Sequence, residues 1–330
     1  MTVTIRDVAR AAGVSVATVS RVFNDSGPVH AETRQRIRDV ALAMRYAPNS
    51  AARSLTTNRS NTLGVLLPDL HGEFFSEVIR GLDQTAQRDG YHVLLSSSHA
   101  DGAAIEVAMR AMRGRVDGLV VMSPDIDAES LAANLPDSLP VVLLNTAAPG
   151  AFDAITVDNY GGAYDMVRHL LAHRDSVAII TGSPNNQDAR ERLRGYRAAV
   201  REAGMTSHDA WEVCGDFTEA GGHRAAMTLL AATPRPRAIF AANDAMAIGA
   251  LSACREVGLR VPADIAVGGF DDIPMARYMN PPLTSVRVEI SELGSRAMQA
   301  LLDAVRLKNQ HERQRVLVPA RLVVRESCGA

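Results

Sequence analysis

The sequence is poor in lysine, cysteine and aromatic side chains. Lys308 is the single lysine among 330 residues and follows a leucine, so the P-loop, which needs lysine after its second glycine, is absent. The chain has no G-x-G-x-x-G or G-x-S-x-G pattern, and HERQR at 311–315 has arginine where a zinc-protease signature has its second histidine. These absences weaken an enzyme interpretation without excluding it, and we expect no catalytic residue, cofactor or metal.

The few cysteines and the lack of long apolar runs bear on the compartment. Cys214, Cys254 and Cys328 lie 40 and 74 residues apart, which is neither a disulfide framework nor a metal-binding arrangement. No run of about 18 apolar residues occurs, so we expect no membrane span. Residues 1–10 carry two arginines and one aspartate instead of an apolar signal segment. We therefore expect a cytoplasmic protein.

The charge is unevenly distributed along the chain. Residues 1–60 contain nine arginines against four acidic residues, a net +5, whereas the whole chain has a net charge of −2 and the remainder is therefore −7. A basic head on an acidic body suggests a polyanionic partner for the head alone. The alternative is a solvated helical face without a partner.

The first 46 residues have the pattern of three helices. Ile5, Val8, Ala9 and Ala12 follow helical spacing, with Thr4 as the N-cap, and Gly13 is suited to end this helix in the left-handed conformation. Ser15 is placed to cap a second helix, 16–24, with apolar positions at 19, 22 and 23. The residues NDSGP form a turn before a third helix, which has apolar residues at 37, 40, 41 and 44.

From residue 62 onward, short apolar runs alternate with amphipathic helical stretches, which predicts an α/β core. About ten strands in 270 residues favour two doubly wound parallel-sheet lobes over one. Helices are expected at 75–90 and 189–204. The buried parallel strands are expected at 62–69, 91–98, 116–123, 140–145, 176–182, 237–244 and 264–272.

Polar residues recur at the expected carboxyl ends of these strands, where ligands bind in such sheets. A polar residue there is at least as often a strand-ending turn, but six together favour a polar pocket. The six are Asp69, Ser123, Asn145, Asp158, Asn243 and Asp271.

The stretch 47–61 joins the two regions. Pro48 is suited to start a short helix, yet a helix of about eight residues is marginal in water without support. The segment is therefore either a plain linker or a segment that folds only on binding.

The residues at the start of the chain resemble a known family. A helix, a glycine-containing turn and a second capped helix form a helix-turn-helix pattern. The stretch TIRDVARAAGVSVATVSRVFN at 4–24 closely resembles the N-terminus of the lactose/galactose repressor family of bacterial transcription regulators. The hinge segment of that family resembles YAPNSAARSL at 46–55, and its core resembles AANDAMAIGAL at 241–251 and VGGFDDIPMARYMNPPLTSV at 267–286. The purine-repressor branch is nearest.

The resemblance implies a homodimer that binds a double-stranded DNA operator and a small-molecule effector, without a membrane partner. Each subunit would have a helix-turn-helix domain at 1–46, a hinge at 47–61, and a core at 62–330 of periplasmic-binding-protein type. One lobe of the core would comprise 62–158 and 289–318, and the other 159–288 and 319–330. When bound to its operator, the protein would be associated with the nucleoid.

The resemblance also implies the DNA-binding residues. Val16, Ala17 and Arg21 would face base edges, with Arg21 as the candidate for a bidentate contact to guanine. Leu55 would insert between base pairs in the minor groove or pack on the partner hinge, with Ala52 and Arg53 in the same groove. The phosphate contacts would be Ser15, Thr18, Ser20, Asn24, Thr33, Tyr46 and Asn49. Ser15 serves equally as a plain N-cap.

For the effector, the resemblance places a pocket between the lobes. Phe75 and Phe217 would pack on the ligand, although ordinary core packing is the alternative. Asn186 and Asp188 stand where the purine-binding branch has arginine and threonine, so a purine is disfavoured. The polar contacts would be Asn145, Asp158, Asp188, Arg192, Asn243 and Asp271. Carboxylates, amides, an arginine and aromatic rings suit a sugar or a sugar derivative.

The implied mechanism is a repressor whose effector alters the hinge spacing, and coupling of this kind is typically about 1–3 kcal/mol. The sequence leaves open whether the effector releases DNA or tightens its binding. The competing interpretation is a cytoplasmic sugar-binding or sugar-modifying protein without specific DNA binding.

Overall fold

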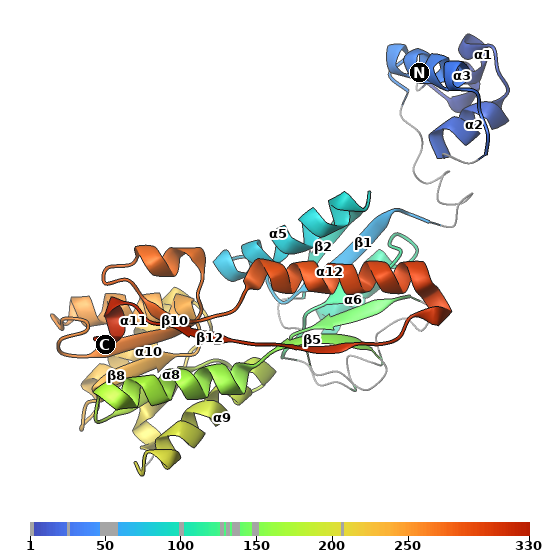
Figure 1. Ribbon diagram of the computed structural model, residues 1–330. Helices are drawn as coiled ribbons and strands as arrows, with labels where there is room; N and C mark the ends of the chain where they lie inside the picture. Colours follow the sequence, from blue (N-terminus) through green and yellow to red (C-terminus); the bar gives the residue numbers. More distant parts are fainter. Residues whose placement is uncertain are drawn as a thin grey trace. The chain divides into compact units, whose positions relative to one another are not determined.

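The computed structural model describes residues 3–24, 27–46, 59–98, 102–125, 129, 133, 139–146, 152–205 and 208–330. The chain divides into two compact units, Met1–Asn61 and Thr62–Ala330 (Figure 1). Among the described residues, none of the helices combines the length and apolar character needed to cross a membrane.

The first unit contains the three helices that the sequence predicts: α1 (Ile5–Ala12), α2 (Val16–Asn24) and α3 (Ala31–Ala43). Thr4 starts α1, and both its backbone N–H and its hydroxyl donate to Asp7 Oδ2, at 3.0 and 2.6 Å. Gly13 ends α1 with φ +65°, a left-handed conformation that glycine adopts without strain. Ser15 Oγ accepts a hydrogen bond from Thr18 N at 3.1 Å, so Ser15 caps α2 as predicted.

A small apolar core holds these helices together. Val8, Val19 and Ile37, one from each helix, are fully buried, and Ala9 and Ala41 pack beside them. Helical spacing places these residues on one side of each helix, so the opposite sides remain exposed.

The second unit contains two six-stranded sheets, and residues of both sheets belong to one large hydrophobic core. The first sheet has the strand order β11-β5-β4-β3-β1-β2, and all its pairs are parallel. In its register Leu66 lies opposite Val121 on one side and Ser96 on the other. Its strands are β1 (Thr62–Leu67), β2 (His92–Ser97), β3 (Leu119–Val121), β4 (Val141–Leu144), β5 (Asp153–Val157) and β11 (Arg315–Val318).

The second sheet has the order β12-β10-β9-β8-β6-β7 and is parallel except at β12, which pairs antiparallel with β10. The chain passes from one sheet to the other after β5, after β10 and after β11. The strands are β6 (Val177–Thr181), β7 (Glu212–Cys214), β8 (Ala238–Ala241), β9 (Ala266–Asp271), β10 (Thr284–Arg287) and β12 (Arg321–Val323).

Helices cover the sheets, which is why the central strands are apolar on both faces. In the first lobe α12 runs alongside α5, and in the second α8 packs on α9 and α10 on α11 (Figure 1). The helices are α5 (Glu73–Arg88), α6 (Gly102–Met112), α8 (Asn159–His173), α9 (Gln187–Glu202), α10 (Glu219–Ala231), α11 (Asp244–Glu256) and α12 (Ile290–Leu307). Short 3-10 helices are η1 (Asp209–Trp211), η2 (Pro274–Tyr278), η3 (Lys308–Gln310) and η4 (Glu326–Cys328).

In each sheet the strand order reverses at one point, between β1 and β3 in the first and between β6 and β8 in the second. Loops from neighbouring parallel strands diverge there and leave room for a ligand at the carboxyl ends. The two reversals therefore mark where a ligand-binding site is expected in this core.

Candidate functional site

The exposed side of α2 carries the residues predicted to face DNA bases. Val16, Ala17 and Arg21 are exposed, whereas Val19 and Val22 of the same helix are buried in the core of the head. Val16 has 41% of its surface exposed. An apolar side chain at this position is available for contact with a partner such as a thymine methyl group.

The predicted phosphate contacts surround this side of α2 or begin the next helix. Ser15 and Thr18 hydroxyls lie 2.9 Å apart, and Asn24 Nδ2 donates to Ser20 Oγ at 3.1 Å. Thr33 lies in the first turn of α3 and is partly exposed. Tyr46 is partly exposed and packs edge-on against Phe23, with ring centroids 5.6 Å apart. These hydroxyl and amide groups remain close enough to the surface to donate to phosphate.

The remaining predicted DNA contacts fall outside the described residues. Asn49, Ala52, Arg53 and Leu55 all lie within 47–58, for which the structure gives no description. Their assignment stays a prediction.

The predicted ligand-binding residues of the core lie where strands end and helices begin. Asn145 directly follows β4, Asp158 follows β5, Asn243 follows β8, and Asp271 ends β9. Asp158 and Asn243 are also N-caps of α8 and α11. The strand-end alternative therefore describes part of their role, and Asn243 Nδ2 also donates to the carbonyl of Phe217 at 3.0 Å.

Backbone strain gathers among these residues. Asn145, Phe217 and Asp271 have φ values of +44°, +64° and +104°, and the neighbouring Asp272 has +51°. Non-glycine residues adopt this region at a cost, and such residues concentrate at functional sites. Three of the eight predicted effector contacts are thus held in strained conformations by the surrounding structure.

Arg192 organises the buried polar groups of the second lobe. The side chain is only 4% exposed, and its Nε donates to Asn159 Oδ1 at 2.8 Å. Its Nη1 donates to the carbonyl of Ala242, and its Nη2 lies 3.4 Å from Asp271 Oδ1. The guanidinium stacks on the ring of Phe270 at 3.8 Å. The arginine therefore joins α9 to α8, to the end of β8 and to the end of β9.

Two carboxyl groups next to Arg192 have raised pKa values. Burial raises the pKa of Asp188 to about 6 and that of Asp271 to about 7, and the positive charge of Arg192 opposes both shifts. Asp188 Oδ1 accepts a hydrogen bond from Asn159 Nδ2 at 2.8 Å. The guanidinium of Arg192 is thus the counter-ion of two carboxylates, and it neutralises only part of their combined negative charge.

Hydrogen bonds bring the two lobes together at this network. Gln187 N, at the start of α9, donates to the carbonyl of Pro124, which follows β3 in the first lobe, at 2.9 Å. Asp125 hydrogen-bonds to Asn186, and burial raises the pKa of Asp125. The carbonyl of Pro124 and the carboxyl of Asp125 thus place residues of the first lobe against the Asp188 network of the second.

The two predicted aromatic contacts are partly buried. Phe75 lies in α5 and packs edge-on against Phe74 at 5.4 Å. The ring of Phe217 lies across Gly182, at the end of β6, where a Cβ would come within 2.1 Å of Phe217 Cζ. Glycine is therefore required at 182 for this ring position. Both rings also contact the apolar core. The contacts therefore fit core packing and leave packing on a ligand as a prediction.

Three residues of the network were missed by sequence reasoning. Asn159 links Arg192 to Asp188, Asp125 reaches across from the first lobe, and Asp244 accepts from Ser285 Oγ and Ile273 N at 2.6 and 2.9 Å. Asn159 and Asp244 each directly follow a predicted contact, so adjacency to a helix-capping residue was the available signal. Asp125 carried no such signal.

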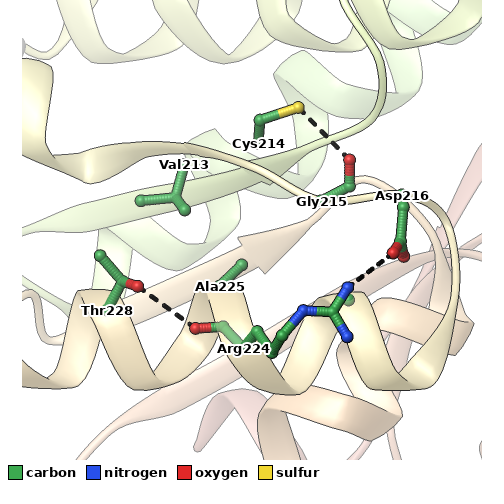
Figure 2. A pocket seen from close by; sticks show the side chains of 8 residues that line it. Val213, Cys214, Gly215, Asp216, Arg224, Ala225 and Thr228 are labelled. Atoms are coloured by element: carbon green, nitrogen blue, oxygen red, sulfur yellow. Dashed lines mark hydrogen bonds and ion pairs between the residues drawn. The ribbon is translucent and has the colours of Figure 1, made fainter.

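A separate cavity of about 290 Å³ lies at the edge of the second sheet (Figure 2). Arg224 and Asp216 form an ion pair of 2.8 Å along its wall, and Cys214 donates weakly to the carbonyl of Gly215 at 3.3 Å. This cavity contains none of the predicted effector contacts. It is lined by Val213, Cys214, Gly215, Asp216, Gly221, Arg224, Ala225 and Thr228.

The raised pKa of Asp188 gives a testable pH dependence. The folded state binds this proton more tightly than the unfolded chain, whose carboxyl titrates near 3.8, so the stabilisation is complete below about pH 4 and is lost as pH rises through 6. Asn at this position cannot ionise. We expect Asp188→Asn to gain about 2–3 kcal/mol relative to wild type between pH 4 and pH 8, measured by urea unfolding.

Asp264 provides a comparison of opposite sign. Hydrogen bonds from Arg260 lower the pKa of its partly exposed carboxyl to about 2, so its contribution is present above about pH 4 and is lost toward pH 2. Asp264→Asn should therefore lose stability relative to wild type at neutral pH and match it near pH 2. A pH-independent effect of Asp188→Asn would contradict the assigned pKa.

Comparisons with known proteins agree with this architecture. Residues 4–49 match the family described as "Bacterial regulatory proteins, lacI family". Residues 167–328 match the family described as "Periplasmic binding protein-like domain". The HTH-type transcriptional repressor PurR of Edwardsiella ictaluri (strain 93-146) is 36% identical over 332 residues, covering 98% of this chain and 96% of the relative. The ribose operon repressor of Haemophilus influenzae (strain ATCC 51907 / DSM 11121 / KW20 / Rd) is 34% identical over 328 residues and covers 98% of each chain.

A solved structure extends the match to three dimensions. The lac repressor dimer bound to operator and the anti-inducer ONPF has a TM-score of 0.90 and 30% sequence identity, with 100% of both chains covered. This structural match spans both regions that the family descriptions cover and the full length of the chain. The chain belongs to the lacI family of bacterial regulatory proteins, and it is a DNA-binding transcription regulator that joins a helix-turn-helix head to a periplasmic-binding-protein-like core.

Proposed function

We propose that the protein is a repressor that binds an inverted-repeat operator as a homodimer and responds to a sugar or sugar derivative. The observation that carries the DNA-binding part is the exposed face of α2, where Val16, Ala17 and Arg21 are presented on a helix capped by Ser15. A capped helix held by a buried core is the geometry with which a recognition helix enters a major groove.

The proposed operator symmetry follows from a dimer. Two copies of α2 related by a two-fold axis contact two half-sites in inverted orientation. We assign 47–61 as the hinge between the head and the core, with Leu55 as the minor-groove wedge. The proposed lobe boundaries follow the change of sheet after β5, β10 and β11.

The proposed effector contacts are Arg192, the two carboxylates of Asp188 and Asp271 beside it, and five further residues of the core. Asp158, Asp188 and Asp271 supply carboxylates, Asn145 and Asn243 supply amides, and Phe75 and Phe217 supply aromatic faces. Carboxylates and amides bind paired hydroxyl groups, and an aromatic ring covers the apolar face of a sugar. We propose that the ligand changes the arrangement of the two lobes and thereby the spacing of the hinges in the dimer. We also propose that the protein acts in the cytoplasm and catalyses no reaction.

The direct test is fluorescence anisotropy of a labelled inverted-repeat duplex from the region upstream of the protein's own gene. Wild-type protein should bind this duplex more tightly than a scrambled duplex of equal length, and one compound from a panel of sugars, sugar phosphates and purines should shift the midpoint. Equal affinity for both duplexes under every condition would contradict specific DNA binding.

Salt dependence checks the phosphate contacts in the same assay. Each neutralised phosphate contributes about 0.9 to the slope of log affinity against log salt. The cations that can neutralise phosphates are the arginines of the head, nine of which lie in residues 1–60. If a dimer neutralises about six or more phosphates, we expect it to lose at least about 10³-fold in affinity between 50 and 200 mM salt. A flat salt response would contradict phosphate binding by the basic head.

A further inference from the structure

The helices that begin at the candidate effector site have their N-termini occupied by the protein itself. A free helix N-terminus binds phosphate, because its first N–H groups lack partners and its dipole favours negative charge. In this core a side-chain oxygen of the protein accepts one of these N–H groups at the start of each of three helices. Asp158 Oδ1 accepts from Gly161 N at 2.9 Å, Asn186 Oδ1 from Ala189 N at 3.1 Å, and Asn243 Oδ1 from Met246 N at 2.9 Å.

The start of α5 is also unsuited to an anion. Gly72 gives it no side-chain cap, but Glu73 places a carboxylate in its first turn. That carboxylate accepts a hydrogen bond from Met275 N of the second lobe at 3.0 Å. Negative charge therefore already occupies this helix end.

Each nitrogen of Arg192 already has an acceptor within the protein. The acceptors are Asn159, the carbonyl of Ala242 and Asp271. Nearby, Arg287 and Arg325 both pair with Asp272 at 2.7 Å. An anion would therefore compete with acceptors of the protein for the N–H groups of these arginines.

The carboxylates around Arg192 set the sign of the local charge. Asp188 and Asp271 share its single positive charge, and Asp125 adds a third carboxyl group from the first lobe. Arg190 also lies near Asp125, and its positive charge opposes the rise in the pKa of that carboxyl. Within the described part of the chain, Arg192 is the cation whose charge opposes the raised pKa values of Asp188 and Asp271. Like charges at close range cost several kcal/mol, so a further anion is disfavoured here.

Three shielded oxygen atoms next to this network lack a hydrogen-bond partner within the described part of the chain: Ser123 Oγ, Asn145 Oδ1 and Gln187 Oε1. Ser123 N donates to Thr146 Oγ1 at 2.7 Å, which holds the ends of β3 and β4 together. Gln187 is joined to Pro124, the residue after Ser123. Unpaired buried acceptors are costly, and a ligand that supplies donors restores the bonds.

From these contacts we infer that the effector is an uncharged molecule rich in hydroxyl groups, and that the site rejects its phosphorylated and carboxylated analogues. Hydroxyl groups donate to the unpaired oxygens and to the carboxylates, whereas a phosphate dianion brings acceptors and negative charge. The inference rests on the effector role proposed above for the same residues.

The test is isothermal titration calorimetry of the full-length protein with matched sets of ligands. Each set contains a neutral pentose or hexose, its phosphate ester and its sugar acid, at pH 7.5. The neutral member of one set should bind, and its phosphate and its acid should bind at least about 100-fold more weakly. Equal or tighter binding of a phosphate or an acid would overturn the inference.

Operator anisotropy with the same ligands separates this inference from the proposed function. A neutral sugar that binds but leaves operator affinity unchanged supports the ligand class and contradicts the allosteric proposal. A sugar phosphate that binds tightly and shifts operator affinity contradicts the ligand class and supports the allosteric proposal. Absence of binding across every set contradicts both.

Asp188→Asn tests the cause of the discrimination. This substitution removes the carboxylate and keeps its shape. It should reduce about tenfold the ratio of the affinity for the neutral sugar to the affinity for its phosphate, because one like charge is lost at short range. Glu202→Gln is the matched control, since it removes one negative charge about 21 Å further along the same helix, beyond the screening distance. An equal effect of the two variants would overturn the electrostatic explanation.

Discussion

Replacing Arg192 with methionine is expected to lower the free energy of unfolding of the core by about 3–5 kcal/mol. The side chain is 4% exposed, and its removal leaves Asp271 without its cation and the carbonyl of Ala242 without its donor. Asn159 Oδ1 loses its partner as well. Uncompensated buried charge and unpaired buried acceptors are the reasons for the large value.

Urea unfolding of the full-length protein, followed by tryptophan fluorescence, measures this change. Trp211 is the single tryptophan and lies in η1 of the core, so the signal reports the core alone. Arg194→Met is the control, because Arg194 is exposed, pairs with Glu191 one turn away and lies over the ring of Tyr160 at 4.9 Å. We expect a change within about 0.5 kcal/mol for this control.

A second substitution distinguishes lost charge compensation from lost packing. Adding Asp271→Asn to Arg192→Met neutralises the buried carboxylate that the first substitution leaves without a cation, so at least half of the lost stability should return. Additive losses would instead assign the effect to packing on Phe270. A loss of less than about 1 kcal/mol in the single variant, the range of exposed ion pairs, would contradict the role given to Arg192.

Replacing Arg21 with alanine is expected to weaken operator binding by about 1–3 kcal/mol in each half-site, and therefore by about twice that for a dimer. Arg21 is exposed on the same face of α2 as Val16 and Ala17, which offer only apolar contact. The arginine thus carries most of the direct hydrogen-bonding readout available on this face. The fold of the head should be unaffected, because the core of Val8, Val19 and Ile37 is untouched.

Specificity gives the sharper measurement. In anisotropy titrations, changing the guanine contacted in each half-site should weaken wild-type binding but leave Arg21→Ala almost unchanged. Arg36→Ala removes an equal charge from the exposed side of α3 and should weaken all duplexes alike. An Arg21→Ala protein that binds the operator as tightly as wild type would refute the proposed readout.

The helix-turn-helix head could be predicted because its determinants are local. The cap at Thr4, the left-handed Gly13 and the cap at Ser15 each act over three to five residues, and all three predictions are confirmed. Helical spacing then fixes which side of α2 is buried. The family resemblance, which depends mainly on these residues, is likewise confirmed.

In the core, the predicted strands were those with continuous apolar runs. All seven are present, although each is shorter than its run, because the polar residues at its ends lie beyond the ladder. The strands β5, β7, β10, β11 and β12 were missed. Edge strands such as β7, β11 and β12 are partly or largely exposed and lack a continuous apolar signal. Short, half-polar strands such as β10 resemble loops in sequence.

The sequence by itself determined the head, the alternation of strands and helices, and the kinds of polar residue that follow the strands. Only the tertiary structure decided which of these residues meet. Arg192 reaches Asn159 and the carbonyl of Ala242 across 33 and 50 residues, and Gln187 contacts Pro124 of the other lobe. Capping and periodicity are short-range effects, whereas these contacts depend on strand order and on the three passages between the sheets. The charge balance of the effector site is therefore a property of the assembled core.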